Sequence, residues 1–275
     1  MLNFRNNPII MLGAIAGDII GSTYEYINDR KYDFELLTDG SFFTDDTVMT
    51  LAIARWIMES DSLSSPDLVK SMVDLGRKYP DAGYGPRFKN WIWSNTPQPN
   101  NSYGNGSAMR VSPVGLYAHS LQEALELAYI TAAVSHSHPE GIKGAQATAA
   151  TIYMTKNGYT KDQIRELISV MFGYNLNRII DEIRPGYEWN DICQRSVPES
   201  IICFLEGKDF EDVVRLAVSL GGDADTLGAI AGSIAACVYP IPEWIAKECE
   251  KRLTPDLLKI MKDFEKYIEN TNLDN

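Results

Sequence analysis

Two short acidic clusters contain carboxylates and hydroxyls in almost adjacent positions. Residues 44–47 read Thr-Asp-Asp-Thr, and residues 222–226 read Gly-Asp-Ala-Asp-Thr. One such side chain is enough to cap a helix N-terminus, because its oxygen satisfies a free backbone N–H. Neighbouring carboxylates also repel one another unless a proton or a cation lies between them. Capping and cation binding therefore both stay open for each cluster.

The chemistry of the two clusters indicates which cations they would bind. Carboxylate and hydroxyl oxygens select Mg²⁺, Mn²⁺ or Ca²⁺, whereas zinc prefers histidine and cysteine sets that these clusters lack. The four aspartates carry four negative charges, which two divalent ions would cancel. Such a pair would also supply the positive charge that an acidic protein needs to bind a phosphorylated ligand.

A polar loop over residues 94–107 lies between the two clusters and is rich in turn-forming residues. Gly104 and Gly106 would let backbone N–H groups approach phosphate oxygens. Ser107 begins a predicted helix whose N-terminus would attract an anion. An isolated Gly-Asn-Gly is also typical of a plain turn, so the residues alone leave both interpretations open.

His136 and His138 lie in the run Ser-His-Ser-His-Pro-Glu at residues 135–140. A spacing of two residues does not place both rings on one helix face, which disfavours a helical zinc pair. The alternative is a pair of histidines at the end of a helix. Asp18 and Arg110 are interpreted as structural ion-pair or capping residues outside the active site.

The elements that position these residues are predicted to be helices. In residues 47–59, for example, Met49, Ile53 and Trp56 recur at the spacing of a buried helical stripe. Further helices are predicted over residues 65–79, 121–135, 140–156, 160–172, 197–206, 209–219, 225–238 and 243–269. No segment alternates between apolar and polar residues with hairpin turns at its ends, so no sheet is expected.

The predicted fold is therefore all-α, a single compact orthogonal bundle of many helices that forms one domain over residues 1–275. The polar C-terminal tail is predicted to fray from about residue 269. The run Gly-Ala-Ile-Ala-Gly occurs at residues 13–17 and again at 228–232. Glycines four residues apart on a helix let a second helix approach closely, so both runs are predicted at tight helix contacts.

Composition excludes several classes of function. The formal net charge is −12 and no run of Lys or Arg provides a basic surface, which excludes binding to bulk nucleic acid. No apolar stretch reaches the roughly 20 residues of a membrane span. The four cysteines match no zinc spacing and are interpreted as reduced thiols in a cytoplasmic protein.

Taken together, four blocks of the sequence resemble the ADP-ribosylglycohydrolase family. The blocks are Gly17-Asp18-Ile-Ile-Gly21 followed by Glu25, then residues 44–47, residues 104–110 (Gly-Asn-Gly-Ser-Ala-Met-Arg) and residues 222–226. Each block is weak alone, but together they are specific. They follow the family order from near residue 13 to near residue 239, so the resemblance covers most of the chain. It implies an all-α fold with a binuclear Mg²⁺ or Mn²⁺ centre.

The resemblance also assigns a role to individual residues. It implies six metal ligands: Thr44, Asp45, Asp46, Asp223, Asp225 and Thr226. The implied catalytic residues are Glu25, Asp45 and Asp46, with Glu25 a candidate for activating water. From the residues alone, Glu25 would be a surface carboxylate. The implied substrate-binding residues are Ser102, Tyr103, Gly104, Asn105, Gly106, Ser107, His136 and His138.

The function that the resemblance implies is hydrolysis of the glycosidic bond between ADP-ribose and a modified protein or small molecule. Two divalent cations would orient the distal ribose and make the attacking water more acidic, and the transition state would resemble an oxocarbenium ion. Arginine, serine, a nucleobase, acetate and polymeric ADP-ribose are all conceivable acceptors, of which we favour arginine. The oligomeric state is not specified by the sequence.

Three alternatives stay open at this point. A glycosidase with two carboxylates could act without metal. A two-metal nucleotide phosphohydrolase would use similar acidic clusters, but would release phosphate or a nucleoside monophosphate. A non-catalytic ADP-ribose-binding module would keep the pocket and lose turnover. The complete set of implied ligands together with Glu25 argues against the binding module.

Overall fold

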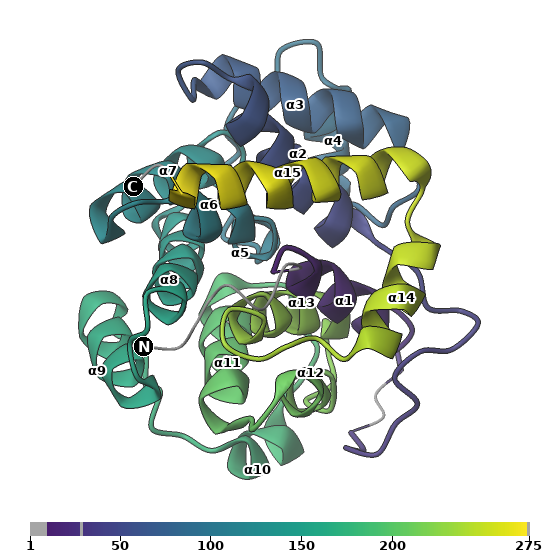
Figure 1. Cartoon of the computed structure of the whole chain (residues 1–275), viewed down its shortest axis with the longest axis vertical. Helices are drawn as coiled ribbons and strands as arrows, with labels where there is room; N and C mark the ends of the chain where they lie inside the picture. The colour runs from purple at the N-terminus through teal and green to yellow at the C-terminus, as the bar shows by residue number, and fades with distance from the viewer. Residues whose placement is uncertain (1–9, 28–29, 274–275) are drawn as a thin grey trace.

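The computed structural model describes residues 10–27 and 30–273, and helices dominate these ranges (Figure 1). The helices are α1 (Leu12–Gly21), α2 (Asp45–Glu59), α3 (Ser65–Lys78), α4 (Pro86–Trp93), α5 (Gly106–Met109), α6 (Ser112–Tyr117), α7 (Leu121–Ala133), α8 (Pro139–Lys156), α9 (Lys161–Phe172), α10 (Ile180–Ile183), the 3₁₀ helix η2 (Arg184–Gly186), α11 (Cys193–Glu206), α12 (Phe210–Val218), α13 (Ala224–Ala235), α14 (Glu243–Arg252) and α15 (Pro255–Leu273). The predicted all-α class is confirmed. Within these ranges, β-type pairing is limited to an isolated bridge between Gly104 and Ile192.

The C-terminal region differs from the sequence prediction. A single helix was expected over 243–269, but α14 ends at Arg252 and α15 begins at Pro255. Proline lacks a backbone N–H and disfavours helical backbone in the residue before it, so the chain changes direction here (Figure 1). Helix α15 then continues to Leu273, past residue 269, where fraying was expected.

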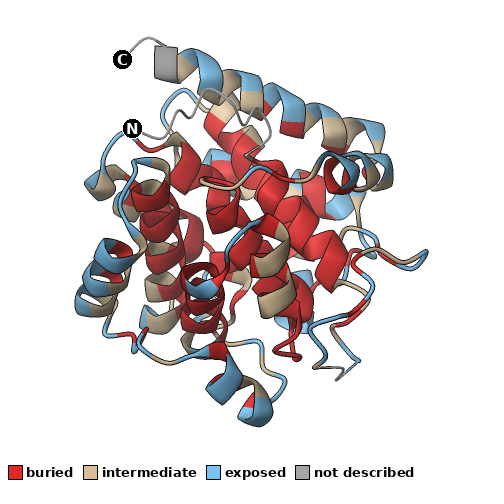
Figure 2. Cartoon of the chain, turned by 60° about the horizontal axis from the view of Figure 1, so that its bottom comes forward, coloured by how far each residue is buried: buried red, intermediate tan, exposed pale blue. Residues whose placement is uncertain are grey.

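Helices α1 and α13 lie at the centre of the bundle, and every residue of both is buried. Helices α11 and α12 pack against α13, α2 packs against α1, and α15 packs against α2. Figure 2 shows the buried helices in the middle of the molecule, with the exposed surface on the outer helices. Among the described helices, none has the length and apolar character needed to cross a membrane.

Glycines set the distance between α1 and α13. A Cβ atom on Gly17 would lie 2.0 Å from the backbone oxygen of Gly228, and one on Gly13 would lie 2.5 Å from that of Gly232. Real Cβ atoms essentially never approach another atom within 3.0 Å. The close helix contact predicted from the repeated Gly-Ala-Ile-Ala-Gly run is therefore confirmed. It also places the C-terminal end of α1, shortly before Glu25, beside the N-terminal end of α13, where the second acidic cluster lies.

We expect Gly17→Ala to lower the free energy of unfolding by about 3 kcal/mol or more, at the upper end of overpacking effects, because the clash is with backbone that no rotamer change can relieve. Urea denaturation would measure the change. Gly186→Ala is the matched control, since no atom lies within 4 Å of its added Cβ, and should stay within about 0.5 kcal/mol of the wild type. Equal unfolding free energies for the two variants would contradict this account of the α1–α13 contact.

Candidate active site

A cavity of about 710 Å³ lies where the N-terminal ends of α2 and α13 meet. All six predicted metal-ligating residues line it, together with Glu25: they are Thr44, Asp45, Asp46, Asp223, Asp225 and Thr226. The structure thus brings together two clusters that are far apart in sequence. A hydrogen bond of 3.3 Å from Thr226 Oγ1 to Asp46 Oδ2 joins them directly.

Asp18 of α1 fixes the first cluster in place. Its fully buried carboxylate accepts hydrogen bonds from the backbone N–H and the hydroxyl of Thr44, at 2.9 and 2.8 Å. It also accepts from the backbone N–H and the hydroxyl of Thr47. Thr44 is the N-cap of α2, and its Oγ1 accepts from the N–H of Asp46. Asp18 therefore satisfies the N-terminus of α2, which leaves the carboxylates of Asp45 and Asp46 in the cavity wall.

The second cluster begins at a turn that only glycine adopts easily. Gly221 and Gly222 both have φ of +77°, in the left-handed region, and they lead into α13. Asp223 occupies the N-cap position of α13, but its side chain makes no capping hydrogen bond. It accepts instead from Asn105 Nδ2 at 2.7 Å. Capping alone therefore does not account for the second cluster.

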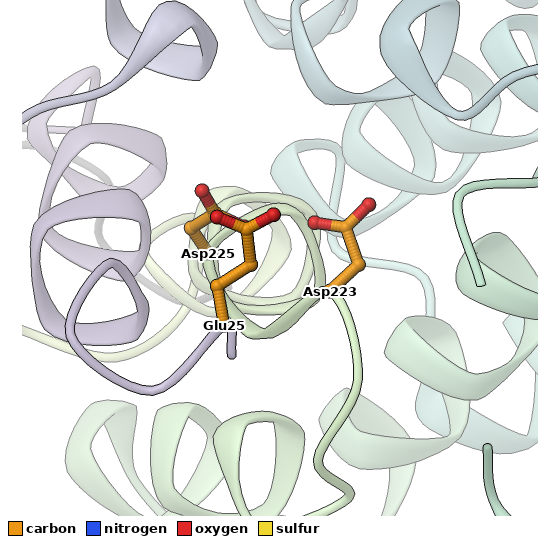
Figure 3. Close-up of side chains that lie close together, drawn as sticks. All are labelled: Glu25, Asp223 and Asp225. Carbon is orange, nitrogen blue, oxygen red and sulfur yellow. The ribbon is translucent and has the colours of Figure 1, made fainter. Parts of the chain in front are cut away.

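The carboxylates of Glu25, Asp223 and Asp225 face one another (Figure 3). One oxygen atom from each lies within 4.8 Å of the others. Burial, with the neighbouring Asp225 as the second cause, raises the pKa of Glu25 to about 7. Burial likewise raises the pKa of Asp223 to about 6 and holds that of Asp225 well above its ordinary range. This acidic cluster could bind a metal ion.

The first cluster has the same electrostatic character. Burial raises the pKa values of Asp45 and Asp46 well above the ordinary range, and Asp225 is the next cause for both. Asp46 Oδ1 is buried with no hydrogen-bond partner among the described residues. A buried carboxylate oxygen without a partner is unfavourable unless a proton or a cation meets it. An all-oxygen donor set with surplus negative charge fits hard divalent cations.

The loop before α5 contributes another wall of the cavity. Ser102, Tyr103, Gly104, Asn105, Gly106 and His136, from the predicted substrate-binding set, all line it. Two members of that set lie elsewhere. Ser107 donates its hydroxyl to the backbone oxygen of Gly141, and His138 caps α8 by accepting from the N–H of Glu140. The geometry gives these two side chains no place in the cavity lining.

A model of the family described as ADP-ribosylglycohydrolase matches residues 10–273. The chain belongs to this family. Membership agrees with the resemblance carried by the four sequence blocks and makes the chain an enzyme of the glycohydrolase type.

Several known proteins are similar to this family member over most of its length. ADP-ribosylhydrolase ARH3 of Homo sapiens is 24% identical, over 90% of this chain and 90% of its own. ADP-ribosylarginine hydrolase Tri1 of Pseudomonas putida is 24% identical, over 86% of this chain and 72% of its own. A solved structure titled ADP-ribosylglycohydrolase-related protein complex shares the fold, with a TM-score of 0.71, 23% identity, and coverage of 94% and 96% of the two chains.

Part of the family member's cavity was not predicted from the sequence. Tyr26, the segment 83–88 and the segment formed by Trp189, Asp191 and Ile192 also line it. Gly-Tyr-Gly-Pro at residues 83–86 is a turn signal that could have drawn attention. The segment at 189–192 carries no comparable signal. Its role is visible only in contacts, since the backbone oxygen of Asp191 accepts from the N–H of Asn105 at 2.7 Å.

In EDTA, we expect the free energy of unfolding to fall as the pH rises from the ordinary pKa of these carboxyls to their pKa in the folded protein. For Asp223 these pKa values are 3.8 and about 6, and for Glu25 they are 4.5 and about 7. Within that window the folded protein binds protons more tightly than the unfolded chain, and this advantage disappears as the pH rises. Asp225→Asn should reduce the slope, because it removes a charge that raises the pKa of Glu25.

Urea denaturation at a series of pH values would measure both slopes. Asp81→Asn is the control, because Asp81 is an exposed carboxyl and lies outside the cavity lining. It should leave the slope unchanged. Identical slopes for the wild type and Asp225→Asn would show that repulsion within the cluster does not govern the pH dependence.

Proposed function

We propose that this enzyme hydrolyses the glycosidic bond between ADP-ribose and an acceptor, and that it depends on two divalent cations, Mg²⁺ or Mn²⁺. The proposal is carried by five carboxylates that line one cavity of about 710 Å³, beside the glycine-rich loop at residues 102–106. These carboxylates are Glu25, Asp45, Asp46, Asp223 and Asp225. In the described residues none of them has an ion-pair partner, so their charge calls for cations.

The proposed cation ligands are the four aspartates of the two clusters with the hydroxyls of Thr44 and Thr226. Cations bound there would orient the hydroxyls of the distal ribose and lower the pKa of a nearby water. Support for this assignment comes from Asp46 Oδ1, which has no hydrogen-bond partner among the described residues, and from the burial and mutual repulsion that raise the pKa values of Asp46 and Asp225.

We assign Glu25 the role of general base. Its carboxylate lies beside the acidic clusters and lines the cavity, and its pKa of about 7 suits proton transfer near neutral pH. A carboxylate oxygen of Glu25 accepts a proton from the attacking water while that water forms a bond to the anomeric carbon. The bond from this carbon to the acceptor breaks, the acceptor takes up a proton from solvent that balances the one accepted by Glu25, and free ADP-ribose is the other product. Glu25 then returns its proton to solvent.

The loop at residues 102–106 is the proposed binding site for the diphosphate. The backbone N–H of Gly106 has no side chain of its own residue to shield it, whereas that of Gly104 donates to Ser102 Oγ at 3.1 Å, and His136 Nε2 lies close to both glycines. Tyr103 is half-exposed at the cavity and offers a ring for stacking. The loop carries the non-reacting part of the ligand, while the acidic clusters face the ribose.

We propose an arginine side chain as the acceptor. The Pseudomonas putida relative is named for hydrolysis of ADP-ribosylarginine. In this chain, exposed Tyr26 and Trp189 line the cavity together with Glu25 and Asp191. Aromatic faces and carboxylates favour a cationic guanidinium.

Four buried cysteines without disulfides suit a reducing cytoplasm, and we propose that the protein acts there. We further propose that the chain forms one domain and that its substrates are ADP-ribosylated proteins or small molecules.

Incubation with a panel of ADP-ribosylated acceptors should release intact ADP-ribose when Mg²⁺ or Mn²⁺ is present, and excess EDTA should stop turnover without unfolding the protein. Mass spectrometry identifies the product and circular dichroism reports the fold. Asp45→Ala and Asp225→Ala should abolish turnover, whereas Asp81→Ala, at an exposed site, should keep it. Release of AMP would instead indicate a phosphohydrolase, full activity in EDTA a metal-free mechanism, and binding without turnover a binding module.

Glu25→Gln tests the base directly, because the amide keeps the size and some hydrogen bonding of the side chain but cannot accept the proton. Turnover should fall by about 10²- to 10⁴-fold with ADP-ribose affinity retained. Turnover measured against Mg²⁺ concentration, with calorimetry for ADP-ribose, separates the roles. Partial recovery at high Mg²⁺ would make Glu25 chiefly a metal ligand. Wild-type turnover at every Mg²⁺ concentration would remove it from the site.

A further inference from the structure

Arg110 is a fully buried cation in the wall of the cavity. Its Nη2 donates to the backbone oxygen of Thr131 and to the hydroxyl oxygen of Ser135, both at 2.8 Å. Its guanidinium carbon lies 5.4 Å from the centre of the Phe88 ring. In the described ranges, no carboxylate forms an ion pair with it. A buried arginine without a carboxylate partner is energetically costly, which points to a role beyond packing.

The contact with Ser135 leads from Arg110 to His136. Ser135 Oγ lies 2.8 Å from His136 Nδ1. Arginine can only donate hydrogen bonds, so the serine oxygen accepts from Nη2. Ser135 is fully buried and its hydroxyl proton cannot turn to water. Among the described neighbours of Ser135 Oγ, His136 Nδ1 is the one acceptor for that proton.

Counting protons then selects one tautomer of His136. If Nδ1 carried the ring proton, the Ser135 hydroxyl would have a buried, unpaired proton, which is unfavourable. If Nδ1 is bare, Arg110 Nη2 donates to Ser135 Oγ and Ser135 Oγ donates to Nδ1, so the serine hydroxyl and Nδ1 are both satisfied. Arg110 Nε and Nη1 have no hydrogen-bond partner among the described residues with either tautomer. The ring proton of neutral His136 then lies on Nε2.

His136 Nε2 lies at the cavity, beside the glycine-rich loop. A Cβ on Gly106 would be 3.1 Å from it and a Cβ on Gly104 would be 3.6 Å from it. No protein acceptor for Nε2 occurs in the described part of the chain, and the ring lines the cavity. Burial, followed by the charge of Arg110, holds the pKa of His136 well below its usual value, which keeps the ring neutral.

We propose that Arg110 is a positioning residue: acting through the Ser135 hydroxyl, it holds His136 as the Nε2–H tautomer and makes the ring a hydrogen-bond donor to a ligand oxygen at Gly104 and Gly106. That the ligand is ADP-ribose rests on the proposed function. The tautomer of His136 in the ligand-free protein does not depend on that function. Arg110 thus selects a donor at the cavity, although from the sequence it was interpreted as a structural residue outside the active site.

Nitrogen-15 NMR of the histidine rings tests the tautomer in the full-length wild-type protein without any ligand. The chain has three histidines, and His136→Phe identifies the signals that belong to His136. We expect a protonated Nε2 and an unprotonated Nδ1 in His136. A protonated Nδ1 in the wild type would overturn the proposal, whatever the enzyme hydrolyses.

Two variants test the connection to Arg110. Ser135→Ala removes the donor to Nδ1, so the Nδ1–H form should become populated and the Kd for ADP-ribose should rise roughly 3- to 10-fold. Arg110→Gln should also populate Nδ1–H, because its amide oxygen can accept the serine proton. Ser112→Ala is the control, since Ser112 is equally buried and its hydroxyl has no partner. It should change neither quantity.

A double-mutant cycle separates a role through His136 from a general structural effect. In the His136→Phe background, Ser135→Ala should no longer change the Kd for ADP-ribose. The proposal would be overturned if the His136 tautomer were unchanged in Ser135→Ala or in Arg110→Gln. It would also be overturned if Ser135→Ala raised the Kd for ADP-ribose as much in the His136→Phe background as in the wild type. If the wild type showed the Nε2–H form but bound no ADP-ribose, the proposed function would fail and the role of Arg110 would stand.

Discussion

The contact between α1 and α13 is the constraint on which the rest of the structure depends. Because glycines face each other across this contact, the two backbones can approach closely, and one end of each helix adjoins a part of the acidic site. Helix α1 carries Asp18, which holds the N-terminus of α2, and is followed by Glu25. Helix α13 begins with the second acidic cluster. The spacing of the carboxylates is therefore set by backbone packing, which is more rigid than any arrangement of flexible side chains.

This rigidity is set against strong electrostatic repulsion. The protein brings buried carboxylates together and provides them with hydrogen bonds from Thr226 and Asn105, but none of them forms an ion pair with a basic side chain among the described residues. A more flexible scaffold would separate the charges. Here the glycine contact and the buried Asp18 hold them in place, and the unfavourable energy stays in the site, where a ligand of opposite charge can relieve it.

The sequence predicted the elements whose signals are local. Helical periodicity located α2, α8 and α9, and paired acidic residues located Asp45, Asp46, Asp223 and Asp225, four of the carboxylates that line the cavity. The break at Pro255 was missed although proline is a local signal, because the apolar pattern continues through it. Ser107 and His138 were assigned by motif position, whereas their side chains turn to backbone groups of α8. The wall at residues 189–192 depends on long-range contacts, which composition and spacing do not encode.

Asn105 connects the two halves of the cavity in a way that has a thermodynamic consequence. Its Nδ2 donates both to Asp223 and to Ser196, and its backbone lies in the glycine-rich loop. A ligand at the loop and a cation at the acidic cluster would thus act on one side chain. Whatever free energy couples them is reciprocal: if a cation raises ligand affinity by some factor, the ligand raises cation affinity by the same factor. In a cell with little free divalent metal, the affinity of the protein for the cation would therefore depend on how much ligand is bound at the loop.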